Sequence, residues 1–225
     1  MTYQGSKEKY AKHIVPILNR FRTPHQTYWE PFFGSGSIMQ HMGPPRIGTD
    51  IMEDLIMLWK DVINDTFIEP SYVTKEMYDN EMSNGVHSSM RAYIGFFWSF
   101  SGMFNKGYSP EFFRKSHSFH KMRLRAVRLR GSTLCTADYR AVGGRGVLIY
   151  ADPPYRGTTT YRGVEPFDHE EFYKWCQMKA EAGNTVIVSE YEMPKEFKLI
   201  LEMPATTSLG TSKREKSKPE RLYTL

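Results

Sequence analysis

Cysteine is scarce in this sequence: Cys135 and Cys176 are the only two among 225 residues, and neither lies in a CxxC or Cys/His spacing. This scarcity excludes a disulfide framework and a cysteine-based zinc site, so we expect no metal and two core thiols. Long apolar runs are also missing, and none reaches the roughly 18 residues that span a bilayer. The first residues, MTYQGSKEKY, lack the apolar core of a signal peptide. We therefore expect a cytoplasmic protein without a membrane partner.

The chain also lacks internal repeats, low-complexity tracts and any linker rich in Pro, Gly or Ser. Hydrophobic residues make up 40% of it and the mean hydropathy is −0.53. These values are typical of a globular chain with one core, and they exclude a fibre, a repeat array and a wholly disordered segment. We expect one domain with a small insertion, and favour a monomer.

The net charge of +5 is unevenly distributed. Residues 105–130 hold eight Lys or Arg against one acid, a local balance of +7, so the remainder carries 5 minus 7, or −2. Concentrated basicity is what a phosphate backbone attracts, because phosphate contacts dominate nucleic-acid affinity. A solvated helix face is an equally good explanation of this segment taken alone.

Short strand-like runs alternate with helical patterns along most of the chain. This alternation predicts an α/β fold with a parallel sheet. The expected strands are Thr27–Glu30, Arg46–Asp50, Thr133–Thr136, Val147–Ala151 and Thr185–Ser189.

Helices are expected near the start of the chain, after Asp50 and from Asp168 to Ala182, with Pro16 kinking or restarting the first. Between residues 61 and 130 the alternation disappears, which predicts a helical insertion. Its last helix should carry a charged face with Lys121, Arg125 and Arg128. The opposing apolar face should hold Met122, Ala126 and Leu129.

A glycine loop follows the first expected strand. The sequence YWEPFFGSGSI covers residues 28–38, and Gly34 and Gly36 lie where the strand gives way to an expected helix. Glycines let a backbone approach its ligand closely, and a helix N-terminus offers free N–H donors, so the loop suits a nucleoside cofactor. The third glycine of the dinucleotide fingerprint is absent, and a purely structural turn remains an alternative.

Asp50 closes the second expected strand, sixteen residues after Gly34. In nucleotide-binding α/β folds, an acid at this place accepts hydrogen bonds from ribose hydroxyls. Capping of the helix that follows is a second role, and it does not exclude the first.

The most specific motif is Asp152-Pro153-Pro154-Tyr155, which follows the apolar strand VLIYA. The two prolines fix an extended backbone without N–H groups and leave the Pro153 carbonyl free to accept a hydrogen bond. Asp152 supplies a second acceptor, and Tyr155 offers an aromatic face for stacking. The tetrapeptide therefore predicts a clamp for a planar amine, although a structural turn is the alternative.

Together these segments resemble the adenine-N6 DNA methyltransferases of the Dam-like (D12) class, alpha group, which use S-adenosylmethionine. The matching segments are YQGSK, EPFFGSGS, TDIMEDLI, ADPPY and VIVSEY, in the order of that family and over most of the chain. The resemblance implies a Rossmann-like S-adenosylmethionine-dependent methyltransferase sheet with a small helical target-recognition insertion. Residues 1–60 and 131–225 would form the catalytic domain, and residues 61–130 the DNA-binding insertion.

The resemblance also implies roles for individual residues. Tyr3 would lie against the cofactor adenine, Lys7 near the cofactor carboxylate, and Asp50 on its ribose. Asp152 would lie between cofactor and target base, in a catalytic set completed by Pro153, Pro154 and Tyr155. The implied cofactor-binding set is Tyr3, Gly5, Lys7, Glu30, Pro31, Phe32, Phe33, Gly34, Gly36, Asp50, Ile51 and Asp152.

Two departures from the family pattern limit what can be transferred. The paired glycine before the lysine is Gly5-Ser6 here, which should keep the close backbone approach. The aromatic-Asn-Gly element of the recognition region is Phe100-Ser101-Gly102, so the family's target sequence is not implied.

Double-stranded DNA is the expected partner. A base inside a duplex cannot reach the clamp, so we expect base flipping. Phe100 or Phe104 could fill the gap in the duplex, although a hydrophobic core is the more usual place for such aromatic residues. The expected nucleic-acid-binding set is Phe100, Arg114, Lys115, Lys121, Arg125 and Arg128, with basic residues of the tail in support.

Other functions remain open at this point. The same clamp chemistry serves methylation of cytosine N4, RNA adenine or a protein amide. A non-catalytic nucleic-acid-binding protein that has kept the fold is a further alternative, and a dinucleotide oxidoreductase is the weakest. A compact methyltransferase without a nuclease motif suggests modification without restriction, in a phage or orphan enzyme, by analogy alone.

Overall fold

The structure is a computed structural model that describes residues 5–110, 112–141, 143–157, 166–204 and 218–225, without the side chains of 112–117. A seven-stranded sheet forms its centre, with the strand order β3-β2-β1-β4-β5-β7-β6. Strands β1 to β5 are parallel, whereas β7 is antiparallel to both β5 and β6. The bounds are β1 Tyr28–Glu30, β2 Arg46–Asp50, β3 Thr133–Thr136, β4 Leu148–Ala151, β5 Thr185–Glu190, β6 Lys198–Met203 and β7 Glu220–Thr224.

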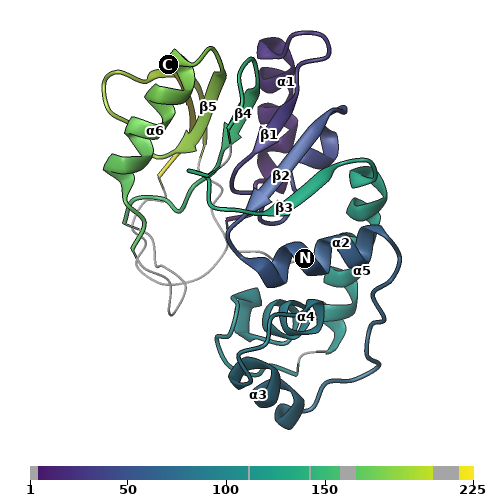
Figure 1. Ribbon diagram of the computed structural model, residues 1–225. Helices are drawn as coiled ribbons and strands as arrows, with labels where there is room; N and C mark the ends of the chain where they lie inside the picture. Colours follow the sequence, from purple (N-terminus) through teal and green to yellow (C-terminus); the bar gives the residue numbers. More distant parts are fainter. Residues whose placement is uncertain (1–4, 111, 142, 158–165, 205–217) are drawn as a thin grey trace.

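The five strands expected from the sequence are confirmed within one residue at each end, whereas β6 and β7 were not predicted. The order of the strands reverses between β1 and β4, because β2 and β3 continue on one side and β5 on the other. Helices cover both faces of the sheet (Figure 1), so the predicted α/β, Rossmann-like fold is confirmed. In open sheets of this kind, ligands bind beyond the carboxyl ends of the strands at such a reversal.

The helices follow the predicted pattern at both ends of the chain. Pro16 lies inside the first helix, and Asp168 caps the last one by accepting from the Glu171 N–H at 2.9 Å. The bounds are α1 Ala11–Phe21, α2 Glu53–Ile63, α3 Lys75–Ser83, α4 Ser89–Phe97, α5 Phe112–Leu129 and α6 His169–Glu181, with short 3-10 turns η1 Glu8–Tyr10, η2 Met39–His41 and η3 Phe100–Gly102.

Alternating side chains of the buried strands build a core on each face of the sheet. Tyr28 and Tyr150 belong to one core, which α1, α2, α4 and α5 complete. Trp29 and Ile149 belong to the other, which packs against Phe172 and Trp175 of α6. The strands are therefore buried on both faces, which explains why they read as continuous apolar runs in the sequence.

Helices α3 and α4 lie apart from the strands, with α2 and α5 between them and the sheet (Figure 1). Asp54 of α2 links α2 to α4, because its buried carboxylate accepts from the Ser88 N–H at 2.8 Å and pairs with Arg91. Phe97 of α4 packs edge-on against Phe119 of α5. Among the described helices, none is long and apolar enough to cross a bilayer.

Two expectations are wrong. The glycine loop leads into the single 3-10 turn Met39–His41 rather than an α-helix, because the chain turns back to enter β2 within a few residues. Cys135 is exposed on the edge strand β3, whereas Cys176 lies on the buried side of α6, as expected. Within the described ranges, no three His, Cys, Asp or Glu side chains gather so that they could hold a metal ion.

Candidate active site

The predicted motifs meet at the carboxyl edge of the sheet, where β1 and β4 lie side by side. Tyr28 of β1 is in register with Leu148 of β4, and both strands run in the same direction. Glu30 ends β1, and Asp152 follows Ala151 at the end of β4. The glycine loop and the Asp152–Tyr155 tetrapeptide therefore start from neighbouring points at the reversal of the strand order.

The glycine loop needs its glycines. Gly34 and Gly36 have φ values of 49° and 60°, a conformation that side chains rarely adopt. A Cβ atom on Gly36 would lie 2.8 Å from the ring of Phe33. The indole of Trp59 donates to the Gly34 carbonyl at 3.0 Å and holds the loop from below.

Asp50 shapes this loop directly. One carboxylate oxygen accepts from the Gly34 N–H at 2.9 Å, and the other accepts from the Met52 N–H at 3.0 Å. Burial raises the pKa of Asp50, and these backbone donors oppose the shift. The N-cap of α2 is Met52, and no side-chain hydrogen bond caps this helix. Asp50 therefore does not cap α2 as expected, and its side chain stabilises the glycine loop instead.

The remaining residues of the loop differ in exposure. Phe33 is buried against Trp59, and Phe32 packs against Tyr139, Phe167 and Phe172, so both rings support the loop from the protein side. Pro31 is buried as well, whereas Ile51 is 67% exposed at the end of β2. Of these four residues, Ile51 is the one with a free surface at the site.

Lys7 lies at the centre of the site. Its ammonium is 2.9 Å from Asp152 Oδ1, donates to the Gly5 carbonyl at 3.1 Å, and is 3.8 Å from Glu220 Oε2. Burial lowers the pKa of Lys7, but the Asp152 and Glu220 carboxylates outweigh burial and leave this pKa raised. The structure thus joins two residues that lie 145 positions apart in the sequence.

Tyr155 does not present the free face that the sequence predicted. Its hydroxyl donates to the carboxylate of Glu220. The Lys7 ammonium lies 4.4 Å from the centre of its ring, and the Tyr191 ring meets it edge-on with centroids 4.7 Å apart. Tyr155 is buried by these contacts, so the prediction of an open stacking face is wrong for this structure.

Four carboxyl groups surround this edge of the sheet: Glu30, Asp152, Glu190 and Glu220. Burial raises the pKa of Glu30 to about 8 and that of Glu190 to about 7. The pKa values of Asp152 and Glu220 are also raised by burial, and Lys7 opposes both shifts. Perturbed titratable groups that cluster at a strand edge are typical of functional sites.

Sequence analysis missed Glu190 and Glu220. The segment VIVSEY contains Glu190, and its position at the end of an expected strand was a usable signal. Glu220 starts β7, which was not predicted, so nothing in the sequence pointed to it.

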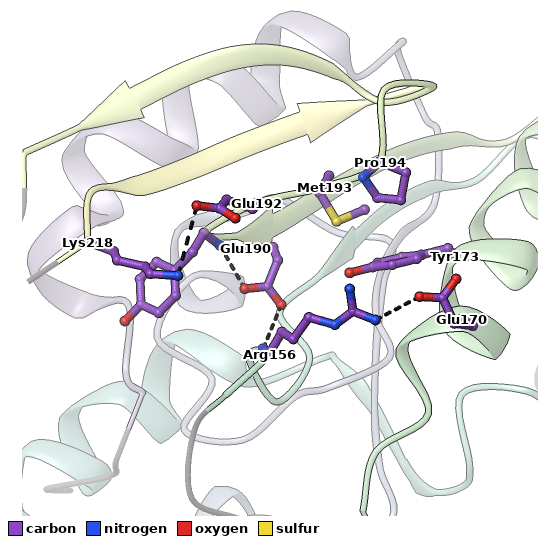
Figure 2. Close-up of a pocket in the computed structure, with 9 residues that line it drawn as sticks. Arg156, Glu170, Tyr173, Glu190, Glu192, Met193, Pro194 and Lys218 are labelled. Carbon is purple, nitrogen blue, oxygen red and sulfur yellow. Dashed lines mark hydrogen bonds and ion pairs between the residues drawn. The ribbon is translucent and has the colours of Figure 1, made fainter.

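A cavity of about 290 Å³ lies beside the tetrapeptide, beyond the ends of β4 and β5 (Figure 2). Its walls include the rings of Tyr173 and Tyr191 and the carboxylate of Glu190. The Arg156 N–H donates to Glu190 at 3.2 Å, while its guanidinium pairs with Glu170 at 2.7 Å. The cavity therefore combines an aromatic surface with hydrogen-bond donors and acceptors. Tyr191 lies in its wall and also contacts the ring of Tyr155.

The expected DNA-binding residues divide into three groups. Lys121 and Arg128 are exposed on α5, and Phe100 is 62% exposed at a turn where Ser101 has a φ of 56°. Arg125 is buried, so its expected place on the charged face is wrong. Arg114 and Lys115 lie in α5 but their side chains are outside the described residues, as is the whole of Tyr3.

Arg125 is buried because acceptors from the N-terminal part of the chain reach it. Its guanidinium donates to the Ser35 carbonyl of the glycine loop and to Glu8. The helical period correctly placed Met122, Ala126 and Leu129 in the core, but it could not show where that core ended.

Three solved structures are similar to the chain. The first is a conserved hypothetical protein of Streptococcus pyogenes, which is 12% identical over 93% of this chain and 92% of that chain. The second is the methyltransferase candidate yhhF of Escherichia coli, which is 11% identical over 98% of this chain and 84% of that chain. The third is SMU.472, a methyltransferase candidate complexed with SAH, which is 11% identical over 97% of this chain and 52% of that chain. Each has a TM-score of 0.39, which is too low to carry a functional argument. A comparison with curated proteins finds no match.

Residues 3–98 match the family model of the D12 class N6 adenine-specific DNA methyltransferase. The matched part includes Lys7, the glycine loop and Asp50, and it ends before the Asp152–Tyr155 tetrapeptide. The predicted resemblance to the D12 class is confirmed over these residues, which make up less than half of the chain, and it supports a methyltransferase that uses S-adenosylmethionine.

Proposed function

We propose that the protein transfers the methyl group of S-adenosylmethionine to the N6 amine of a flipped adenine in double-stranded DNA. The observation that carries this proposal is the place of Asp152. Its carboxylate follows a buried strand beside the glycine loop, and it already forms an ion pair with a nitrogen cation, the ammonium of Lys7, at 2.9 Å. A site for an amine thus adjoins the site expected for a nucleoside cofactor.

The residues at the loop fit the cofactor. Gly36 lets the loop pack closely over the buried side chains of Phe33 and Leu129. Asp50 and Ile51 lie at the neighbouring strand end, where a ribose is expected. Lys7 is also next to this loop, since its backbone N–H donates to the Ser37 hydroxyl at 3.2 Å. When bound, the cofactor supplies an electrophilic methyl group on a positively charged sulfur.

The tetrapeptide prepares the nucleophile. The lone pair of the adenine amine is delocalised into the ring, so the planar amine is a poor nucleophile. Hydrogen bonds from its two protons to Asp152 and the Pro153 carbonyl favour a pyramidal nitrogen and aim the lone pair at the methyl group. As the bond between the methyl group and the cofactor sulfur breaks, positive charge appears on N6, and the carboxylates around it stabilise that charge without reorganisation. N6 then releases one of its protons to water, by way of the acceptor that holds it.

Asp152 must be ionised to accept both the Lys7 ammonium and an incoming amine. Burial raises its pKa, while the adjacent Lys7 opposes that shift. Lys7 thereby favours the ionised form of the carboxyl group, which accepts hydrogen bonds. The cavity beside Tyr191 offers the flipped base an aromatic wall and the carboxylate of Glu190.

The helical segment 61–130 would hold the DNA. Lys121 and Arg128 are exposed for phosphate contacts, with Arg114 and Lys115 on the same helix. Phe100 projects at a tight turn and is suited to enter the gap that a flipped base leaves. Flipping costs a few kcal/mol of unstacking, which these contacts must offset.

The test is incubation with methyl-labelled S-adenosylmethionine and unmethylated duplex DNA, followed by digestion to nucleosides. Label in N6-methyl-2′-deoxyadenosine is the expected result. Label in N4-methyl-2′-deoxycytidine would identify cytosine as the target base. Label that appears only when RNA or protein is supplied in place of DNA would overturn the DNA substrate. Cofactor binding without any transfer would favour a non-catalytic nucleic-acid-binding protein.

Two variants make the assay specific for the tetrapeptide. Asp152→Asn removes one acceptor, and we expect turnover to fall by about two to three orders of magnitude while the cofactor still binds. Glu181→Gln removes an exposed carboxylate at the end of α6, next to the amino end of β5 and far from the site, and should leave turnover unchanged. Appreciable turnover by the Asn variant would contradict the mechanism.

A further inference from the structure

Arg125 connects the basic helix to both cofactor-side segments of the chain. One guanidinium nitrogen donates to the Ser35 carbonyl, between the two glycines of the loop. The other donates to the carboxylate of Glu8 at 2.5 Å, and Glu8 follows Lys7 directly. A single side chain of α5 therefore contacts the glycine loop and the segment that carries Lys7.

A second route joins the same segments to the exposed face of α5. Gln40 donates to Glu8 at 2.9 Å through its amide nitrogen and accepts from Arg128 at 3.1 Å through its amide oxygen. Arg128 lies one turn after Arg125 and is exposed. Glu8 thus receives hydrogen bonds from a buried arginine and, through Gln40, is linked to an arginine on the expected DNA face.

This arrangement is costly if its only purpose is stability. The side chain of Arg125 is 7% exposed, whereas its partner Glu8 is 50% exposed and remains partly hydrated. Burial lowers the pKa of Arg125, and its Nε has no hydrogen-bond partner among the described residues. An apolar side chain of similar size would fill the same space without the desolvation penalty, as replacements of buried ion pairs indicate.

We infer that Arg125 is a positioning residue that links the DNA-binding face of α5 to the cofactor loop, so that DNA binding and cofactor binding strengthen each other. This inference rests on the proposed function, because it needs both ligands. Each ligand would order one end of the same network, and the other would then bind to a segment that is already held. Linkage requires the effect to be equal in both directions.

The test measures the affinity for S-adenosylhomocysteine by calorimetry, with and without a saturating short DNA duplex. Phosphate contacts do not depend on sequence, so a duplex of mixed sequence is sufficient. For the wild-type protein, we expect the duplex to increase the affinity by about fivefold or more. In Arg125→Met this ratio should fall to about one, and Arg125→Lys should restore part of it, since lysine can still reach Glu8.

Glu8→Gln is the second variant, because Arg125→Met leaves the Ser35 carbonyl without its donor and can unfold the chain. The side chain of Glu8 is half exposed, so the fold should tolerate Glu8→Gln. The ratio of the two cofactor affinities, with and without the duplex, should fall as it does in Arg125→Met. Arg123→Met removes one positive charge from the same helix at an exposed position, and the ratio should stay at its wild-type value.

The outcomes separate this inference from the proposed function. A wild-type ratio of about one, or a wild-type ratio retained in both Arg125→Met and Glu8→Gln, would overturn the linkage while cofactor binding and methyl transfer remain. A purely structural Arg125 would lower the melting temperature of the variant and leave the ratio unchanged. Failure of the wild-type protein to bind the cofactor at all would instead defeat the proposed function.

Discussion

Glu30 should make the stability of the protein depend on pH in an unusual direction. Its carboxyl group is 3% exposed and accepts from the Tyr28 hydroxyl at 2.6 Å. Burial raises its pKa from 4.5 to about 8, so the folded protein holds a proton that the unfolded chain releases above pH 4.5. The contribution to stability is therefore complete below pH 4.5 and is lost as the pH rises towards 8.

The size of this effect follows from the shift. Each pKa unit corresponds to about 1.4 kcal/mol, so the loss between pH 5 and pH 8 is about 3–4 kcal/mol. Glu30→Gln cannot titrate, and its amide oxygen can still accept from Tyr28. Burying the amide NH₂ group costs about 1–3 kcal/mol at every pH, but this cost does not change with pH.

Denaturant unfolding of wild type and Glu30→Gln at pH 5, 6, 7 and 8 measures the difference directly. We expect the stability of the variant relative to wild type to increase by about 3–4 kcal/mol across this range. Glu196→Gln, an exposed carboxyl, is the control and should follow the wild-type curve. If the difference in unfolding free energy between Glu30→Gln and wild type stays constant within about 1 kcal/mol from pH 5 to pH 8, the argument from burial is refuted.

Three further predictions concern ligands. In Asp50→Asn the side chain can accept from only one of the two backbone N–H donors. We expect calorimetry to show about tenfold weaker cofactor binding, which corresponds to the loss of one charge-assisted hydrogen bond. An unchanged affinity would mean that Asp50 does not contribute to cofactor binding. The logarithm of DNA affinity should fall with the logarithm of salt by about 0.9 per phosphate contacted, and Lys121→Gln should lower this slope by about one unit. A slope near zero would mean that the basic helix has a structural role and does not contact phosphates. Phe100→Ala should leave the melting temperature unchanged, because the ring is exposed, and should slow methylation of a paired target about tenfold in single-turnover assays. Equal slowing of an unpaired target would mean that the ring does not assist flipping.

The sequence is informative where the structure depends on local pattern. The buried strand LIYA is apolar at every position because both faces of β4 are covered, and such runs between turn residues are visible in the sequence. Strand β7, with the sequence ERLYT, joins the sheet between β5 and β6, and two of its five residues carry charged side chains. Nothing local distinguishes it from an exposed segment, so it was not predicted.

The charged face of α5 shows the same limit within one helix. Arg125 lies four residues after Lys121 and three before Arg128, so the helical period assigns all three to one side. The boundary of the buried side is set by Glu8, 117 positions earlier in the chain, and by the Ser35 carbonyl. A periodic pattern cannot include such long-range partners, so it predicts the faces of a helix better than it predicts which residues lie at their border.

The charges at the carboxyl edge of the sheet fit transfer of a methyl group from a cation. At neutral pH the raised pKa of Glu30 keeps that carboxyl group largely protonated, and Glu190 is near its midpoint. Asp152 and Glu220 face one ammonium, that of Lys7, which favours the ionised form of both carboxyl groups against burial. The proposed reaction moves a positive charge from the cofactor sulfur to the adenine nitrogen, and neither end requires a strong base. A site with fixed carboxylates and one lysine can stabilise that charge throughout the transfer, which is the electrostatic reason to favour amine methylation at this edge.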